Sequence, residues 1–177
     1  MKKQVCAFLV ILFLSNGYSG IFNPGSIEVG GGGSFSSNFI EHKPVLYAFA
    51  IGGGVSYFLS PHLFIDPELI ISRIVQGDNS TSSKAIYGNL GYVFNTDEVV
   101  MPFLATGVGY WTGINKYANG YRSTDDGVIF PTLNLGTKIM FVQNVFLNLA
   151  GQYAVRNSNS TVNNFTVSFG ISGKIHK

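Results

Sequence analysis

Histidines are the first candidates for chemistry in this chain, because both catalytic triads and metal sites draw on imidazole. The sequence holds three of them, at His42, His62 and His176. None lies in an alternating apolar stretch beside a serine with an acid on the same face, and no two have the spacing of metal ligands. Glu41 next to His42 is the sharpest enzymatic candidate, but it lacks a nucleophile partner. The pattern predicts no catalytic and no metal site.

The single cysteine and the main glycine run give no cofactor site either. Cys6 lies in an apolar stretch near the start, and loss of that stretch would leave no thiol for a disulfide or a thiolate metal site. Gly30–Gly33 lacks the lysine and hydroxyl residue of a phosphate-binding loop. We therefore expect no cofactor, and we predict that the chain is not an enzyme.

The start of the chain has the composition of a signal peptide. Lys2 and Lys3 precede the apolar run Val5–Leu14, and the small and polar residues of Ser15–Gly20 follow. The run has ten residues, whereas a membrane-spanning helix needs about 20. We predict a cleaved signal peptide over 1–20 and one domain over 21–177. Without the two lysines, nine basic residues balance nine acidic ones, so nucleic acid is not an expected partner.

The remaining sequence alternates with a period of two. In Val45–Phe58 and again in Phe165–Ile175, large apolar residues occupy every second position, and small or polar residues lie between them. Such alternation is typical of strands that present different faces to different surroundings. The same pattern predicts eight strands, at 26–36, 45–58, 63–73, 84–94, 100–111, 128–141, 144–154 and 164–175.

The connections between these strands alternate in length. Long ones are expected at 37–44, 74–83, 112–127 and 155–163, and short ones at 59–62, 95–99 and 142–143. Outer-membrane barrels have short periplasmic turns and longer extracellular loops, with strands of about 9–11 residues. The pattern predicts an all-β, eight-stranded antiparallel up-and-down transmembrane barrel. Both termini should lie in the periplasm and Thr112–Gly127 outside.

Charge placement supports a membrane barrel. Only 11% of residues are charged, whereas soluble domains have about 25%. The charges within strands fall on the small or polar face, which predicts a polar network in the lumen made of Glu28, Asp66, Glu68, Lys138 and Lys174. We expect Glu28 to pair with Lys174 across the seam of the barrel, and Asp66 and Glu68 to meet Lys138. A structural plug is favoured over an ion pathway, because so narrow a barrel is filled by side chains.

Three segments resemble the eight-stranded outer-membrane barrel families of the opacity-protein and outer membrane protein A or X type. Met101–Tyr110 is similar to the Pro-Tyr-Leu-Gly-x-Gly-x-Gly-Tyr strand of those barrels, and Ile27–Phe35 and Asn89–Tyr92 have the same glycine-rich style. The resemblance implies an integral protein of the outer membrane of a Gram-negative-type bacterium, in contact with membrane lipid.

The long connections are where function is expected, since binding residues concentrate on loops of a rigid scaffold. A mixture of aromatic and charged residues marks one of them as a candidate extracellular interaction loop: Lys116, Tyr117, Tyr121, Arg122, Asp125 and Asp126. The leading hypothesis is a monomeric structural or adhesion barrel that meets a host or other extracellular ligand. A lipid-modifying barrel enzyme, a small pore and a lipocalin-like periplasmic barrel remain alternatives.

Overall fold

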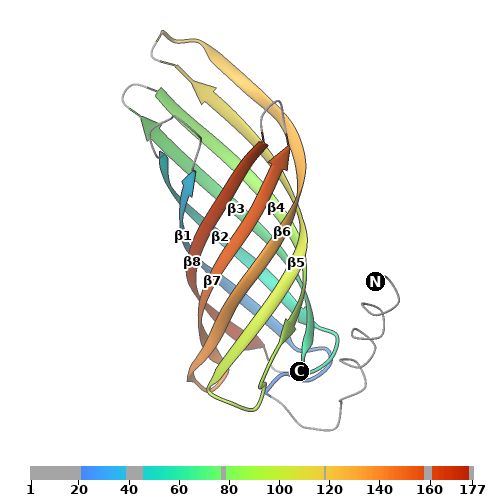
Figure 1. Ribbon diagram of the computed structural model, residues 1–177. Helices are drawn as coiled ribbons and strands as arrows, with labels where there is room; N and C mark the ends of the chain where they lie inside the picture. The colour runs from blue at the N-terminus through green and yellow to red at the C-terminus, as the bar shows by residue number, and fades with distance from the viewer. Residues whose placement is uncertain (1–20, 39–45, 77–78, 118, 158–160, 176–177) are drawn as a thin grey trace, which may run out of the picture.

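The computed structural model describes residues 21–38, 46–76, 79–117, 119–157 and 161–175, and every regular element in these segments is a strand. Each strand pairs antiparallel with the next, and β1 also pairs with β8, which closes the sheet into a tilted barrel (Figure 1). No helix in this part of the chain could cross a membrane. The predicted eight-stranded up-and-down barrel is confirmed. Its strands are β1 (Ile27–Asn38), β2 (Leu46–Phe58), β3 (Leu63–Gln76), β4 (Asn79–Val93), β5 (Val100–Lys116), β6 (Arg122–Val142), β7 (Val145–Asn157) and β8 (Thr161–Ile175).

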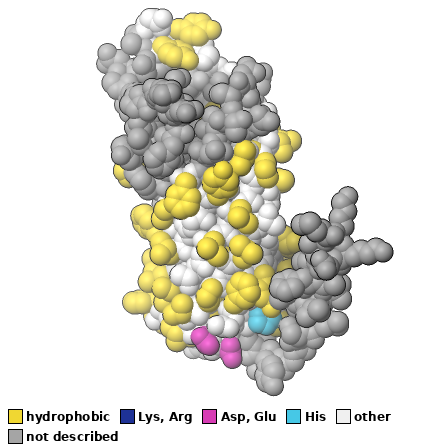
Figure 2. Space-filling view, in the orientation of Figure 1, with side chains coloured by type: hydrophobic (Ala, Val, Ile, Leu, Met, Phe, Trp, Pro, Cys, Tyr) yellow, Lys and Arg dark blue, Asp and Glu magenta, His cyan; other side chains and the backbone are white. Residues whose placement is uncertain are grey.

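Because residue types alternate along each strand, the barrel wall has an outer surface of large apolar side chains and an inner surface of small or polar ones. Ile51 is 72% exposed on the outside, while its neighbour Ala50 turns inward. Phe169 and Ser168 repeat this arrangement in β8. Hydrophobic side chains accordingly cover much of the strand wall (Figure 2). Large apolar groups outside and small or polar groups inside are the reverse of a water-soluble barrel, so the predicted facing is confirmed.

The strands differ from the expected ones at a single end of the barrel. The short connections remain turns, but β3 continues to Gln76, β5 to Lys116, and β6 begins at Arg122. The expected loop Thr112–Gly127 is therefore mostly a strand extension around residues 117–121, and the hairpin of β5 and β6 reaches farthest from the short turns (Figure 1). Backbone hydrogen bonds need no apolar side chain, so the ladder runs on beyond the point where the alternation of residue types fades.

The closing seam between β1 and β8 depends on glycine. A Cβ atom at Gly32 would lie 2.1 Å from the carbonyl oxygen of Phe169 and 2.6 Å from the Cα atom of Gly170, its register partner. Neither contact could be relieved by a side-chain movement, because both atoms belong to the backbone. The glycine-rich first strand thus allows the two ends of the sheet to approach closely.

The apolar core lies inside the barrel at the end that carries the short turns. Phe22, which precedes β1, is fully buried and stacks on Phe58, with ring centroids 4.0 Å apart. The ring centroid of Phe146 lies 5.2 Å from that of Phe22. We call this cluster the aromatic plug; its buried members are Phe22, Phe58, Phe64, Val93, Met101, Ala105 and Phe146.

Candidate functional site

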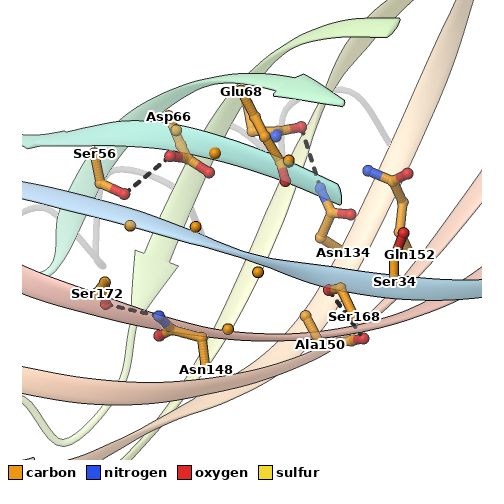
Figure 3. Close-up of a pocket in the computed structure, with 18 of the residues that line it drawn as sticks. Ser34, Ser56, Asp66, Glu68, Asn134, Asn148, Ala150, Gln152, Ser168 and Ser172 are labelled. Carbon is orange, nitrogen blue, oxygen red and sulfur yellow. Dashed lines mark hydrogen bonds between the residues drawn. The ribbon is translucent and has the colours of Figure 1, made fainter. Parts of the chain in front are cut away.

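The lumen above the aromatic plug is polar and holds a cavity of about 160 Å³. Side chains from several strands point into it, among them Ser56 of β2, Asp66 and Glu68 of β3, and Asn134 of β6 (Figure 3). All of them occupy inward positions, because the period of two sends alternate residues of each strand to the same side. Four of the predicted lumen residues, Glu28, Asp66, Glu68 and Lys138, line this cavity, whereas Lys174 does not.

The central contact of this lumen is an ion pair between Glu28 of β1 and Lys138 of β6. Lys138 Nζ lies 2.6 Å from Glu28 Oε1, and the two residues are 5% and 2% exposed. Ser172 donates a second hydrogen bond to the same carboxylate oxygen, at 2.5 Å. The Lys138 ammonium also lies 5.7 Å and 5.6 Å from the ring centroids of Phe64 and Phe103, within range of cation–π attraction.

The expected ion pair between Glu28 and Lys174 is wrong, although the register that motivated it is correct. The two residues are partners in the β1–β8 ladder. However, Lys174 Nζ donates to the carbonyl oxygen of Ile21, in the segment before β1. Lys174 lies near the rim, where that carbonyl is within reach, and the lumen is narrow enough for Lys138 to cross it to Glu28.

Asp66 and Glu68 form no direct ion pair with Lys138 among the described residues, although Asp66 lies within electrostatic range of its ammonium. Asp66 accepts a hydrogen bond from Ser56 Oγ at 2.9 Å, from the neighbouring strand β2 (Figure 3). Glu68 lines the same cavity without a hydrogen-bond partner among the described residues. The Lys138 ammonium contacts Glu28 directly, and these two carboxylates line the cavity.

A set of buried amides forms a second polar layer that the sequence did not indicate. Asn89 Oδ1 accepts hydrogen bonds from Thr132 Oγ1 at 3.2 Å and from Asn134 Nδ2 at 3.1 Å. Asn148 Nδ2 donates to Ser172 Oγ at 2.7 Å, which extends the network around Glu28. Inward asparagines on alternating strands were the available signal, but without a register their partners could not be named.

The segment that carries Phe22 crosses the mouth of the barrel at the short-turn end. Ile21 N donates to Thr96 O at 2.8 Å, in the turn between β4 and β5, and Gly25 N donates to Phe58 O at 2.8 Å. The segment is thus tied to both sides of the opening. Sequence reasoning missed this function of Phe22, because one aromatic residue ahead of the first strand has no periodic pattern around it.

The predicted interaction loop is a structured hairpin tip, which we define as residues 116–122. Lys116 and Arg122 are register partners that end the β5–β6 ladder. Tyr117 N donates to Tyr121 O at 3.0 Å, and the two tyrosine rings lie 5.8 Å apart. Asp125 pairs with Gly113 through the backbone, and the side chains of Asp125 and Asp126 lie outside the described residues.

Of the three histidines that the sequence offered for chemistry, the structure describes His62. His62 Nδ1 lies 2.9 Å from the carbonyl oxygen of Val93, and its ring stacks on Tyr92 at 5.3 Å. His42 and His176 lie outside the described residues, as does Glu41. The described part of the chain contains no group of His, Cys, Asp and Glu residues that could hold a metal ion.

Comparison with known families decides what kind of barrel this is. The sequence matches the outer membrane protein beta-barrel domain over residues 10–172. The chain belongs to this family. Its strands are therefore the membrane-spanning elements of an outer-membrane barrel.

Solved structures of outer-membrane barrels share the fold at low sequence identity. Neisserial surface protein A matches with a TM-score of 0.74 and 16% identity, over 85% of this chain and 99% of that one. The N-terminal barrel of OprF from Pseudomonas aeruginosa matches with a TM-score of 0.65 and 15% identity, over 87% of this chain and 100% of that one. Ail, the attachment invasion locus protein of Yersinia pestis, matches with a TM-score of 0.62 and 13% identity, over 85% of this chain and 99% of that one. No curated protein sequence matches this chain.

Proposed function

We propose that this outer-membrane barrel is a non-enzymatic surface-interaction protein that binds an extracellular ligand through its hairpin tip. In this proposal residues 1–20 are a cleaved signal peptide, the short turns lie in the periplasm of a Gram-negative-type bacterium, and the barrel acts as a monomer. The aromatic plug closes the periplasmic end, and the hairpin of β5 and β6 extends away from the membrane.

The observation that carries this proposal is the composition of the hairpin tip. Tyr117 and Tyr121 are 44% and 63% exposed, far from the apolar wall that lipid would cover. Exposed tyrosines offer a large contact area at a low entropic cost, and tyrosine and arginine are enriched at binding hot spots. Lys116 and Arg122 lie beside the tyrosines, and neither has a carboxylate partner among the described side chains.

Side-chain contacts between neighbouring strands stabilise the β5–β6 extension that carries the hairpin tip. Inside the barrel, Thr81 Oγ1 donates to Asn115 Oδ1 at 2.8 Å, and Asn115 Nδ2 lies 3.4 Å from Ser123 Oγ. This chain of contacts joins β4, β5 and β6 close to the hairpin tip. A binding surface on paired strands loses less entropy on complex formation than one on a free loop.

Two cations without a carboxylate partner among the described side chains, beside two tyrosines, favour an anionic, ring-bearing ligand such as a sulfated saccharide. Guanidinium and ammonium groups bind oxyanions, and aromatic faces take apolar ring surfaces. A solved complex of Ail contains the heparin analogue sucrose octasulfate, which is a ligand of this class on a barrel of the same fold. We therefore assign the hairpin tip to polyanionic glycans at an extracellular surface.

The alternative functions have less support. A lipocalin-like barrel would be soluble, which does not fit outward side chains such as Phe49 and Ile51, each 72% exposed. An open pore does not fit the aromatic plug. A lipid-modifying enzyme would need a histidine beside a serine and an acid, whereas His62, the one histidine in the described part of the chain, contacts Val93 and Tyr92 through its ring.

The proposal is tested by measuring binding of the barrel, held in lipid nanodiscs, to immobilised heparin. Replacing both Tyr117→Ala and Tyr121→Ala is expected to weaken binding by about tenfold or more, as loss of hot-spot residues does. The matched control is Tyr153→Ala, since Tyr153 is 43% exposed on the wall but is not part of the hairpin tip. Unchanged binding in the double variant, or an equal loss in the control, would refute the proposed site.

A further inference from the structure

The outer surface of the barrel separates charges by sign. Among the side chains that the structure describes, the outward charged residues of the strands are all cations, namely Arg73, Lys84, Lys116 and Arg122. Among the same described side chains, the carboxylates that lie in strands are Glu28, Asp66 and Glu68, and these three face the lumen. The described part of the outer wall therefore presents positive charge only, and two of its cations, Arg73 and Lys84, lie in β3 and β4 and not in the hairpin tip.

Arg73 and Lys84 directly follow the apolar part of the wall. In β3 the outward column rises through Leu69 and Ile71, which are 47% and 49% exposed, and its next outward residue is Arg73. In β4 the outward column ends with Ile86, 57% exposed, and its next outward residue is Lys84. Both neighbouring columns thus change from lipid-facing to cationic at the same level.

The ladder places these two cations next to each other. Ile71 is the register partner of Lys84, and Arg73 is the partner of Ser82, so Arg73 and Lys84 are diagonal neighbours on one face. Diagonal neighbours on one face of a sheet have backbones about 7–8 Å apart. Two long side chains such as these can span that distance. Neither has an ion-pair partner among the described residues.

The position of Arg73 and Lys84 relative to the membrane follows from the number of strand residues between them and the short-turn end. A tilted strand crosses the hydrocarbon core in about 9–11 residues. Counted from the short-turn end at Leu63 in β3 and at Val93 in β4, that length ends at Arg73 and Lys84. Lys116 lies farther up, in the extension. The pair is therefore at the level of the lipid headgroups, and the hairpin tip is above it.

We propose that Arg73 and Lys84 form a binding site for the phosphate of an anionic lipid in the outer leaflet. The planar guanidinium can bind two phosphate oxygens at once, while the ammonium adds a point charge from the next strand. Acyl chains of the same lipid would lie along the apolar columns that end in Ile71 and Ile86. A lipid rather than free phosphate is the ligand, because the apolar surface and the cations are continuous.

The test is native mass spectrometry of the full barrel, released from detergent micelles that contain phosphatidylcholine and phosphatidylglycerol. The wild-type chain should retain phosphatidylglycerol in preference to phosphatidylcholine. Arg73→Gln with Lys84→Gln should weaken retention of phosphatidylglycerol by about tenfold, since each basic group near a membrane contributes to anionic lipid binding. Arg73→Lys with Lys84→Arg keeps two cations and should retain the lipid. Heat-modifiable gel mobility verifies folding of each variant.

Lys116→Gln with Arg122→Gln is the matched control, because it removes the same charge from the hairpin tip and should leave lipid retention unchanged. Equal lipid retention by the Arg73/Lys84 glutamine variant and the wild type would overturn the proposal. An equal loss in the hairpin-tip variant would overturn it too, since net charge alone would then explain binding. Displacement of the lipid by inorganic phosphate would overturn the assignment to a lipid. None of these outcomes depends on heparin binding by the hairpin tip.

Discussion

Lys138 lies where an unpaired charge would be costly, because it is 5% exposed inside the barrel. Its ammonium is neutralised by Glu28, and Asn148 Oδ1 lies 3.5 Å away as a weaker neighbour. Glu28 depends on this contact as much as Lys138 does, since its second oxygen, Oε2, is buried without a hydrogen-bond partner in the described structure. Each member of the pair thus makes burial of the other tolerable.

At this scale we predict that Lys138→Met destabilises the barrel by about 3–5 kcal/mol, because Glu28 would be left as an uncompensated buried charge. Adding Glu28→Gln should recover part of the loss, since an amide is far less costly to bury than a carboxylate. The measurement is a double-mutant cycle on urea unfolding in lipid vesicles.

The control for that cycle is Lys174→Met. Lys174 donates to the carbonyl oxygen of Ile21 and forms no ion pair with Glu28, its partner in the β1–β8 ladder, so its coupling with Glu28→Gln should be much weaker than that of Lys138. Coupling of Glu28 with Lys174 instead of Lys138 would show that the lumen ion pair is assigned to the wrong lysine.

At the scale of the element, the β1–β8 seam is the most exacting part of the barrel. Closure requires the first and last strands to lie close together over their whole length, and Gly32 opposite Gly170 leaves no space for a side chain. A substitution there would act on the backbone of two strands at once. Gly88 in β4 is different, because a Cβ atom at that position would meet nothing within 4 Å.

We predict that Gly32→Ala destabilises the barrel by about 1–3 kcal/mol, the usual cost of overpacking. Gly88→Ala should be neutral or slightly stabilising, because alanine restricts the unfolded chain more than glycine does. Both are measured as the midpoint of urea unfolding in lipid vesicles. Equal effects of the two changes would mean that the seam tolerates a Cβ atom and that the close approach at Gly32 is not required.

The elements themselves were predictable from the sequence to a large extent. The alternation of Val45–Phe58 and the inward position of Glu28 are properties of one strand at a time, so they could be determined without knowledge of the fold. The extension of β5 to Lys116 was not predictable in this way, because its polar residues resemble those of a loop. A ladder of polar residues is stabilised by backbone pairing and leaves a weak trace in the pattern of residue types.

The site was predictable only in part, since its contacts cross the barrel. The sequence placed Lys138 in the lumen, but its partner depends on which inward carboxylate lies opposite after closure. Phe22 shows the same limit, because its function depends on three other aromatic residues that meet only in the folded state: Phe58, Phe64 and Phe146. Facing is a local property of a strand, whereas pairing across the lumen is a property of the whole barrel.

At the scale of the whole molecule, the barrel presents different chemistry in three directions. Its outer wall is apolar, its lumen holds a cavity lined by polar side chains, and its two ends differ. The end with short turns is closed by the aromatic plug and carries the exposed residues Asp97 and Glu98. The opposite end carries the hairpin tip with Lys116 and Arg122. Such an arrangement fits a protein that crosses the membrane in one fixed orientation.

The last prediction tests wall and orientation together through single cysteines. The chain has one cysteine, Cys6, which the predicted signal-peptide cleavage removes, so an introduced thiol would be unique. Cysteine at Ile51 or Phe169 should react with a lipid-soluble maleimide, because these positions are 72% and 66% exposed on the wall. Their inward neighbours, Ala50 and Ser168, provide the matched controls and should remain unlabelled.

Orientation is read in intact cells with a maleimide that cannot cross the outer membrane. Cysteine at Tyr121, in the hairpin tip, should be labelled from outside, whereas cysteine at Glu98, in the turn between β4 and β5, should react only after the cells are opened. The reason is that outer-membrane barrels keep their short turns in the periplasm. Labelling of the cysteine at Glu98 but not of the cysteine at Tyr121 on intact cells would show that the barrel has the opposite orientation. The hairpin tip would then lie where no extracellular ligand could reach it.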